Sequence, residues 1–97
     1  MFNIYNYSDP EIVFENAKQY LGENVIIRFS DKPPKKFMVL NPETNKWVHF
    51  GQMPYQDFTF SRNHNKRLHY LRRSENIKGN WKNNKYSANN LSRNILW

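Results

Sequence analysis

Residues 36–50 read KFMVLNPETNKWVHF, and this stretch decides the fold predicted for the chain. Two short runs rich in β-branched and aromatic residues, 36–40 and 46–50, flank the segment NPETN at 41–45. Asn and Pro supply turn geometry, and two apolar runs of this length joined by such a turn are typical of a β-hairpin. We therefore expect an antiparallel hairpin at the centre of the fold.

The sequence before the hairpin predicts one helix. Ser8 is a good N-cap, Pro10 falls in the first turn, and Glu11 follows Ser8 by three positions, which is the capping-box spacing. Apolar residues then recur near the helical period, and Gly22 is a typical C-terminal stop. We expect this helix over residues 9–21.

A further strand is predicted between this helix and the hairpin. Residues 24–29, NVIIRF, are rich in β-branched side chains. Residues 30–35 are expected to form a loop, because the Pro33-Pro34 pair fits neither a helix nor a central strand. Residues 51–60 are less regular and are expected to cover a sheet edge.

Two helices are predicted after the hairpin. The first spans residues 61–75 with Ser61 as its N-cap. Residues 77–85 read as a loop rich in Asn, and Ser87 would cap a last helix over 88–96. The predicted fold class is therefore α+β, a small three-stranded antiparallel sheet with an N-terminal helix and two C-terminal helices.

The length of 97 residues predicts a single domain, residues 1–97. Charge divides it into a scaffold of about residues 1–60 and a basic helical part of about 61–97. The basic part holds nine Lys and Arg against one acid, whereas the scaffold holds six against seven. Such an imbalance raises the local positive potential and attracts polyanions. We therefore interpret the basic part as a phosphate-binding surface that the scaffold presents.

The predicted helix 61–75 places its cations on one side. With Leu68 at the centre of the core-facing side, His64, Leu71 and Glu75 fall beside it, and the apolar stripe is narrow. The opposite side carries one basic residue per turn at positions i, i+4, i+7 and i+11, namely Arg62, Lys66, His69 and Arg73. An ordinary solvated charged face explains this helix equally well. Acids are scarce in this part of the chain, and basic residues continue beyond the helix. Both features favour the interpretation that the basic side chains contact successive phosphates.

Trp81 lies between two lysines in the segment KGNWK at 78–82. Its ring could stack on a base or sugar, although a structural role as the anchor of the loop is the interpretation that we prefer for Trp81. The residues predicted to bind nucleic acid are Arg62, Lys66, Arg67, His69, Arg72, Arg73, Lys78, Trp81, Lys82 and Lys85. No sequence-reading motif is visible, so we expect contacts to the backbone and weak sequence preference.

Catalysis is the competing class of function. The chain has three histidines, and only His49 with Asp57, eight positions apart, suggests a pair that could meet in space. Paired carboxylates, phosphate-binding loops, metal-spaced histidines and cysteines are absent from the sequence. We therefore expect no enzymatic activity, no catalytic residue, no metal and no cofactor.

Several strings in residues 37–97 resemble a family of short basic proteins of large nucleocytoplasmic DNA viruses. The most specific are WVHFGQ at 47–52 and KGNWK at 78–82, accompanied by NNL at 89–91 and LW at the end. Pro54 departs from the Gly expected there, and residues 61–69 carry fewer acids than similar sequences do. The resemblance implies a viral origin and an intracellular setting, and it transfers no site residue.

The first hypothesis is therefore a small viral protein that binds nucleic acid, DNA being favoured over RNA, in genome packaging or organisation. The alternative is a structural virion protein, of the minor capsid or core, that docks an acidic protein partner through its basic face. A nuclease is the third hypothesis. We expect a location in the virion or the host cytoplasm, with the host nucleus open, and other virion proteins or a second copy as further partners. No membrane association is expected, because the longest apolar runs are too short to span a bilayer.

Overall fold

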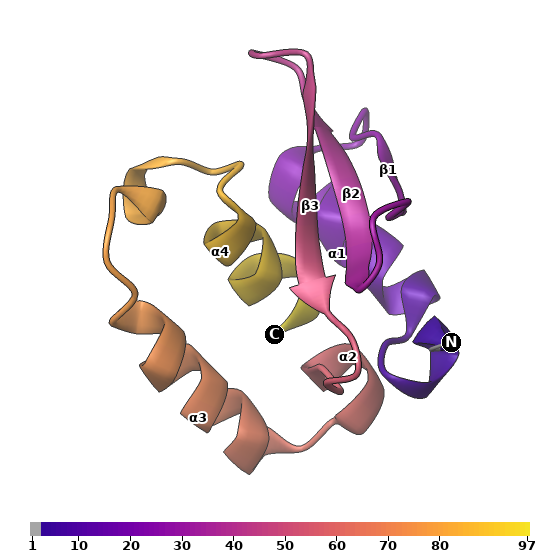
Figure 1. Ribbon diagram of the computed structural model, residues 1–97, viewed down its shortest axis with the longest axis vertical. Coiled ribbons are helices and arrows are strands. Elements are labelled where there is room, and N and C mark those ends of the chain that lie inside the picture. The colour runs from indigo at the N-terminus through magenta and orange to yellow at the C-terminus, as the bar shows by residue number, and fades with distance from the viewer. Residues whose placement is uncertain (1–2) are drawn as a thin grey trace.

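The computed structural model describes residues 3–97 and confirms the predicted α+β class (Figure 1). In chain order the elements are η1 Ile4–Asn6, α1 Pro10–Leu21, β1 Ile27–Phe29, β2 Lys35–Asn41, β3 Lys46–Gln52, α2 Phe58–Ser61, α3 His64–Glu75, η2 Trp81–Asn83, α4 Ala88–Leu91 and η3 Ser92–Leu96. The last element continues α4 with π-type hydrogen bonding, so the two form one C-terminal helix. No helix within residues 3–97 is long and apolar enough to cross a membrane.

The sheet has the order β1-β2-β3, and both pairings are antiparallel. Phe37 pairs with Phe50 and Val39 with Val48, which places apolar side chains of β2 and β3 on one face. The predicted hairpin is therefore confirmed. The strand predicted at 24–29 is shorter than expected, because only the last three of these residues pair along β2.

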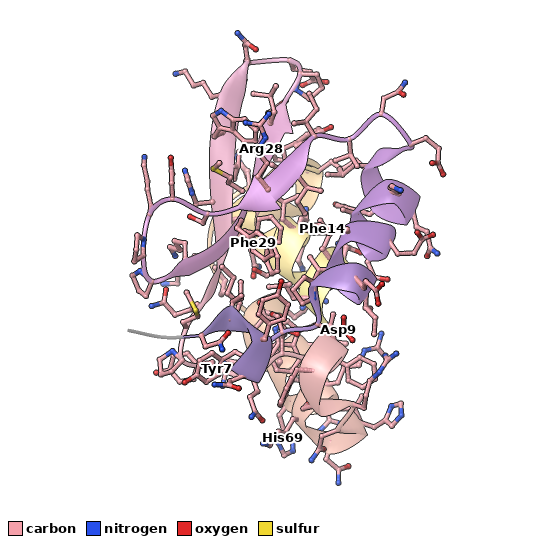
Figure 2. All side chains as sticks on the ribbon, turned by 90° about the vertical axis from the view of Figure 1, so that its right-hand side faces the viewer. Tyr7, Asp9, Phe14, Arg28, Phe29 and His69 are labelled. Carbon is pink, nitrogen blue, oxygen red and sulfur yellow. The ribbon has the colours of Figure 1, made fainter. Side chains whose placement is uncertain are left out.

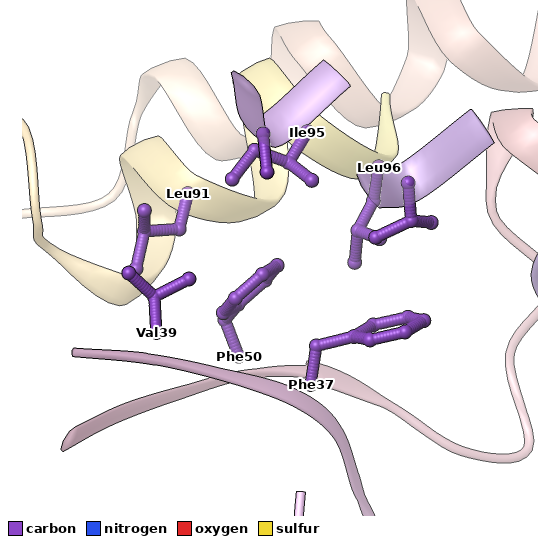
Figure 3. Close-up of a cluster of buried hydrophobic side chains, with 8 residues drawn as sticks. Phe37, Val39, Phe50, Leu91, Ile95 and Leu96 are labelled. Atoms are coloured by element: carbon purple, nitrogen blue, oxygen red, sulfur yellow. The ribbon is translucent and has the colours of Figure 1, made fainter. Parts of the chain in front are cut away.

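The core lies between this face of the sheet and two helices. Figure 3 shows Phe37, Val39 and Phe50 of the sheet facing Leu91, Ile95 and Leu96 of the C-terminal helix. Val13 and Ala17 of α1 complete the cluster, and all eight side chains are buried. Burying an aliphatic or aromatic side chain of this size stabilises the fold by about 1.5–3 kcal/mol, so this cluster is the main source of stability.

Aromatic rings extend the core toward the edge strand. Phe14 of α1 contacts both Phe29 of β1 and Phe37 of β2 edge-to-face, at ring-centroid distances of 5.7 and 5.9 Å. Figure 2 shows Phe14 and Phe29 facing each other on this side of the molecule. Edge-to-face pairs add about 0.5–1.5 kcal/mol beyond burial, so these rings fix α1 against β1.

The N-cap predicted for the first helix is wrong by one residue. The Asp9 side chain accepts from the Ile12 amide and caps α1, while Gly22 ends the helix at a positive φ of 107° as predicted. Ser8 is buried, and its hydroxyl donates to the Asp57 carboxylate instead. Ser8 is therefore not the N-cap, because its side chain is hydrogen-bonded to Asp57, which is distant in the sequence.

A buried ion pair joins the sheet to the segment before α2. Lys36 of β2 donates to Asp57 at 2.9 Å, and both side chains are almost fully buried. Asp57 also accepts from the Thr59 amide and hydroxyl. Burial lowers the pKa of Lys36, and the Asp57 carboxylate opposes that effect. Because every oxygen of the carboxylate is bonded, the charge is tolerated in the interior.

The predicted helix 61–75 is interrupted in the structure. Arg62 adopts a left-handed conformation with φ of 54°, which ends α2 at Ser61 and separates it from α3. Asn63, rather than Ser61, caps α3 by accepting from the Lys66 amide. Figure 1 shows that α3 lies at the periphery, beside the C-terminal helix.

Candidate nucleic-acid interface

The predicted core-facing side of α3 is wrong. Leu68 is 50% exposed, and the only fully buried residue of the helix is Ser74. The inward side carries Arg67, Tyr70, Leu71 and Ser74, which are spaced i, i+3, i+4 and i+7. The helix is thus rotated relative to the prediction, because polar and aromatic contacts position it rather than an apolar stripe.

These inward residues bind α3 to the C-terminal helix mainly through backbone oxygens. Arg67 Nε donates to the main-chain oxygen of Trp97 at 2.6 Å. Arg93 Nη1 donates to the Leu71 main-chain oxygen at 2.7 Å and to the Ser74 hydroxyl at 2.5 Å. Charge-assisted hydrogen bonds are stronger than neutral ones, so the two arginines clamp the helix.

An open groove runs beside α3. Its lining consists of Pro54, Tyr55, Gln56, Lys66, His69, Tyr70, Arg73 and Trp97, and its volume is about 490 Å³. Lys66, His69 and Arg73 are exposed on α3, and none of them is found in an ion pair with an acid within residues 3–97. Three of the four residues of the predicted basic face therefore line one groove, without nearby neutralisation.

Two of the aromatic residues of the groove form a stack. Tyr70 and Trp97 lie parallel, with ring centroids 4.4 Å apart and planes 12° apart. The Arg73 guanidinium lies over the Tyr70 ring at 5.7 Å. Burial raises the pKa of Tyr70, so its phenol stays neutral beside these cations. The Tyr70–Trp97 stack therefore forms an aromatic surface beside Lys66, His69 and Arg73, which we call the cationic wall of the groove.

Arg62 lies apart from this groove. Both Arg62 and Arg67 stack on the Phe58 ring, at 5.4 and 5.2 Å. Together with Arg93 they line a second cleft, of about 350 Å³, between α1, α2 and the C-terminal helix. Arg62 was predicted to continue the ladder of α3, and the left-handed turn at this residue removes it from the helix. Arg67, also predicted as a phosphate ligand, is half-buried and bonded to Trp97.

The Asn-rich loop after α3 is organised around Trp81. The indole N–H donates to the Ile77 main-chain oxygen at 2.6 Å, and Lys82 and Arg93 lie over the ring at 5.5 and 5.4 Å. The ring is half-buried. These contacts fit the anchoring role better than an open stacking platform.

Glu75 neutralises part of the basic surface. It pairs with Lys82 at 2.7 Å and with Arg93 at 3.1 Å. The hydrogen bond and charge of Lys82 lower the pKa of Glu75. Lys82 is therefore a weaker candidate for phosphate binding than its neighbours.

Three further residues that were predicted to bind nucleic acid are exposed on α3 or in the loop after it. Arg72 and Lys78 are exposed, and Lys85 lies over the Tyr20 ring at 5.0 Å. None of the three is paired with an acid within the described part of the chain. Arg72 and Arg73 occupy the last turn of α3, where they also complement the helix dipole.

Comparison with known families adds one finding. Residues 25–74, just over half of the chain, match a family of unknown function, DUF5754. The chain belongs to the DUF5754 family. The matched region runs from β1 to the end of α3, so it includes the cationic wall of the groove but not Trp97. No curated protein and no solved structure matches the chain. The resemblance to proteins of large DNA viruses stays a prediction, because the DUF5754 description names no organism and no function.

The candidate catalytic pair does not form in this DUF5754 chain. His49 Nδ1 contacts the Ser30 hydroxyl at 2.7 Å, whereas the Asp57 carboxylate is bonded to Ser8, Lys36 and Thr59. The part of the chain that the structure describes contains no group of three or more His, Cys, Asp or Glu side chains that could hold a metal ion.

Sequence reasoning missed the aromatic half of the groove. Tyr55 precedes α2, Tyr70 lies on α3, and Trp97 follows the C-terminal helix. The sequence separation hides their proximity. The one local signal was the spacing from Lys66 to Tyr70 and from Tyr70 to Arg73, which places a ring beside two cations on a helix.

Proposed function

We propose that the protein binds nucleic acid through its backbone phosphates, with weak sequence preference, using the exposed cations of α3 and the adjoining loop. The observation that carries this proposal is the gathering of Lys66, His69 and Arg73 along one groove without a neutralising acid in the described residues. Lys and Arg at such a surface release condensed counterions when they neutralise phosphates.

The side chains on the exposed side of α3 support weak sequence preference. α3 is held along its inward side by Arg67 and Arg93, and its exposed side presents mainly basic residues. Base-edge readout generally uses a helix or ribbon that enters the major groove with several polar side chains. Basic side chains that are spread along one surface instead favour phosphate contacts, which position a ligand without reading its sequence.

Genome packaging or organisation in a large DNA virus is the setting that we propose, and that part rests on the resemblance alone. Charge neutralisation is the physical requirement of packaging, and the chain has a net charge of +7. We propose no catalytic chemistry for this surface.

Charge reversal tests the proposal. In a variant with Arg62, Lys66 and Arg73 changed to Glu, the groove loses two phosphate contacts and the neighbouring cleft loses one cation, so binding to a labelled DNA at low salt should be abolished. All three side chains are exposed, so the fold should persist. Fluorescence anisotropy measures the affinity, and circular dichroism checks the fold.

A control variant changes net charge equally at other places. Lys18, Lys32 and Lys46 are exposed and lie outside α3 and its groove. Changing these three to Glu should cost much less affinity, because only the long-range field changes. Equal losses in the two variants would show that net charge alone, rather than this surface, determines binding.

A further inference from the structure

The groove beside α3 contains an exposed aromatic ring in addition to the basic side chains that phosphate binding requires. Tyr55 is 68% exposed at its edge. No hydrogen bond, ring contact or cation–π contact is found for the Tyr55 side chain within residues 3–97. Among the exposed large hydrophobic side chains of residues 3–97, Tyr55 has the highest exposed fraction. Tyr55 therefore offers an unused aromatic face.

The tyrosine and tryptophan rings of the groove other than Tyr55 are already engaged. Tyr70 stacks on Trp97 and also carries the Arg73 guanidinium. Gln56 is fixed by donating to the Asn6 main-chain oxygen at 3.3 Å. Because Tyr70 and Trp97 have partners, Tyr55 is the large aromatic ring of the groove that is available for a ligand within residues 3–97.

The size and composition of the groove fit a nucleotide. Its volume of about 490 Å³ falls within the range of sites for small molecules. Lys66 and Arg73 supply the charge for a phosphate, His69 supplies a ring nitrogen for a hydrogen bond, and Tyr55 supplies a surface for a base. Bases within a duplex are stacked on each other, whereas an unpaired base can turn outward and stack on a protein ring.

We propose that the groove takes an unpaired base of single-stranded nucleic acid, which stacks on Tyr55 while Lys66, His69 and Arg73 contact the flanking phosphates. This inference rests on the proposed function and specifies its ligand. It agrees with weak sequence preference, since every base has a face that can stack. A duplex would be held by the cations alone.

The decisive experiment compares three labelled ligands of equal length: oligothymidine, the same strand with abasic sites, and a duplex. The abasic strand keeps the phosphates and removes the bases. Wild-type protein should bind oligothymidine about 5- to 150-fold more tightly than the abasic strand, which is the range for loss of one stacked base. Equal affinity for the two strands would overturn the inference.

Variants then locate the effect. Tyr55→Ala should weaken binding of oligothymidine by a similar factor and leave binding of the abasic strand and the duplex unchanged. Tyr55→Phe should retain the wild-type preference, because stacking uses the ring and not the hydroxyl. The matched control is Tyr5→Ala, since Tyr5 is also 61% exposed but lies outside this groove. A loss in Tyr5→Ala equal to that in Tyr55→Ala, or no loss in Tyr55→Ala, would contradict the assignment.

The two proposals fail in different ways. If wild-type protein binds all three ligands equally and with steep salt dependence, phosphate binding stands and the stacking site is refuted. If it binds none of them at low salt, the proposed function itself fails. Binding of polyglutamate as tight as that of oligothymidine would refute both proposals and favour an acidic protein partner.

Discussion

Replacing Arg93 by alanine should loosen the attachment of α3 to the C-terminal helix without unfolding the core. Arg93 Nη1 makes two hydrogen bonds to α3, to the Leu71 main-chain oxygen and to the Ser74 hydroxyl. Hydrogen bonds of a charged group contribute about 1.5–3 kcal/mol each. The ion pair of Arg93 with Glu75 adds little, because Glu75 is half exposed.

The resulting loss is about 3 kcal/mol for the two bonds, given that one nitrogen makes both. The Tyr70–Trp97 stack and the Arg67 bond to Trp97 still hold the first turns of α3. Leu68 on its outer side is 50% exposed and adds little. Local opening of α3 should therefore become about 100-fold more frequent, at about 1.4 kcal/mol per decade. The amides of β2 and β3 should keep their protection, because the core cluster around Phe37 and Phe50 is unchanged.

Native-state hydrogen exchange measures this effect residue by residue. Arg72→Ala is the matched control, because Arg72 is exposed on α3 and its side chain makes no described contact. Arg93→Lys should give an intermediate loss, since lysine keeps the charge but not the planar donors. If the α3 amides exchange as in the wild type, or if α3 and β2 lose protection equally, the clamp reasoning is refuted.

Three further predictions concern stability and can be measured by urea denaturation. Lys36→Met leaves the buried Asp57 carboxylate without its cation and should cost about 3–5 kcal/mol; a loss below 1 kcal/mol would mean that water reaches the pair. Gly51→Ala should also destabilise, by about 1–3 kcal/mol, because φ is +81° and the added Cβ would lie 2.9 Å from the Lys36 side chain. Leu68→Ala should change the free energy of unfolding by less than about 0.5 kcal/mol, whereas Leu91→Ala in the core should cost about 2–5 kcal/mol. Similar losses in the free energy of unfolding for the two variants would indicate that Leu68 faces the core, as the sequence predicted.

The hairpin and the last helix could be predicted because their signals are local. The two apolar runs, 36–40 and 46–50, and the turn segment 41–45 between them indicate the pairing of β2 with β3. Ser87 caps α4 by accepting from the Asn90 amide, as its position suggested. In both places local preference and tertiary packing agree.

The caps of the other helices could not be settled locally. Ser8 and Asp9 are both suitable N-caps, and so are Ser61 and Asn63. The structure selects Asp9 because Ser8 is bonded to Asp57, a residue 49 positions away. It selects Asn63 because Arg62 turns left-handed. Only the tertiary arrangement distinguishes such neighbours.

The candidate site was predictable in its charge but not in its aromatic residues. The spacing of Lys66, His69 and Arg73 placed them on one side of a helix whichever residue began it, and they do line one groove. The prediction that Leu68 faces the core failed because α3 is held by arginines and a ring stack, which leave no apolar periodicity in the sequence. Trp97 reaches the groove from the far end of the chain.

The salt dependence of binding tests the central claim most directly. For wild-type protein on duplex DNA, the plot of log K against log salt should have a slope of about −2.7 if the exposed cations of α3, Lys66, Arg72 and Arg73, each neutralise one phosphate. Removing two of these cations, in Lys66→Ala with Arg73→Ala, should bring the slope to about −0.9. A flat plot for the wild type, or an unchanged slope in the double variant, would contradict the account.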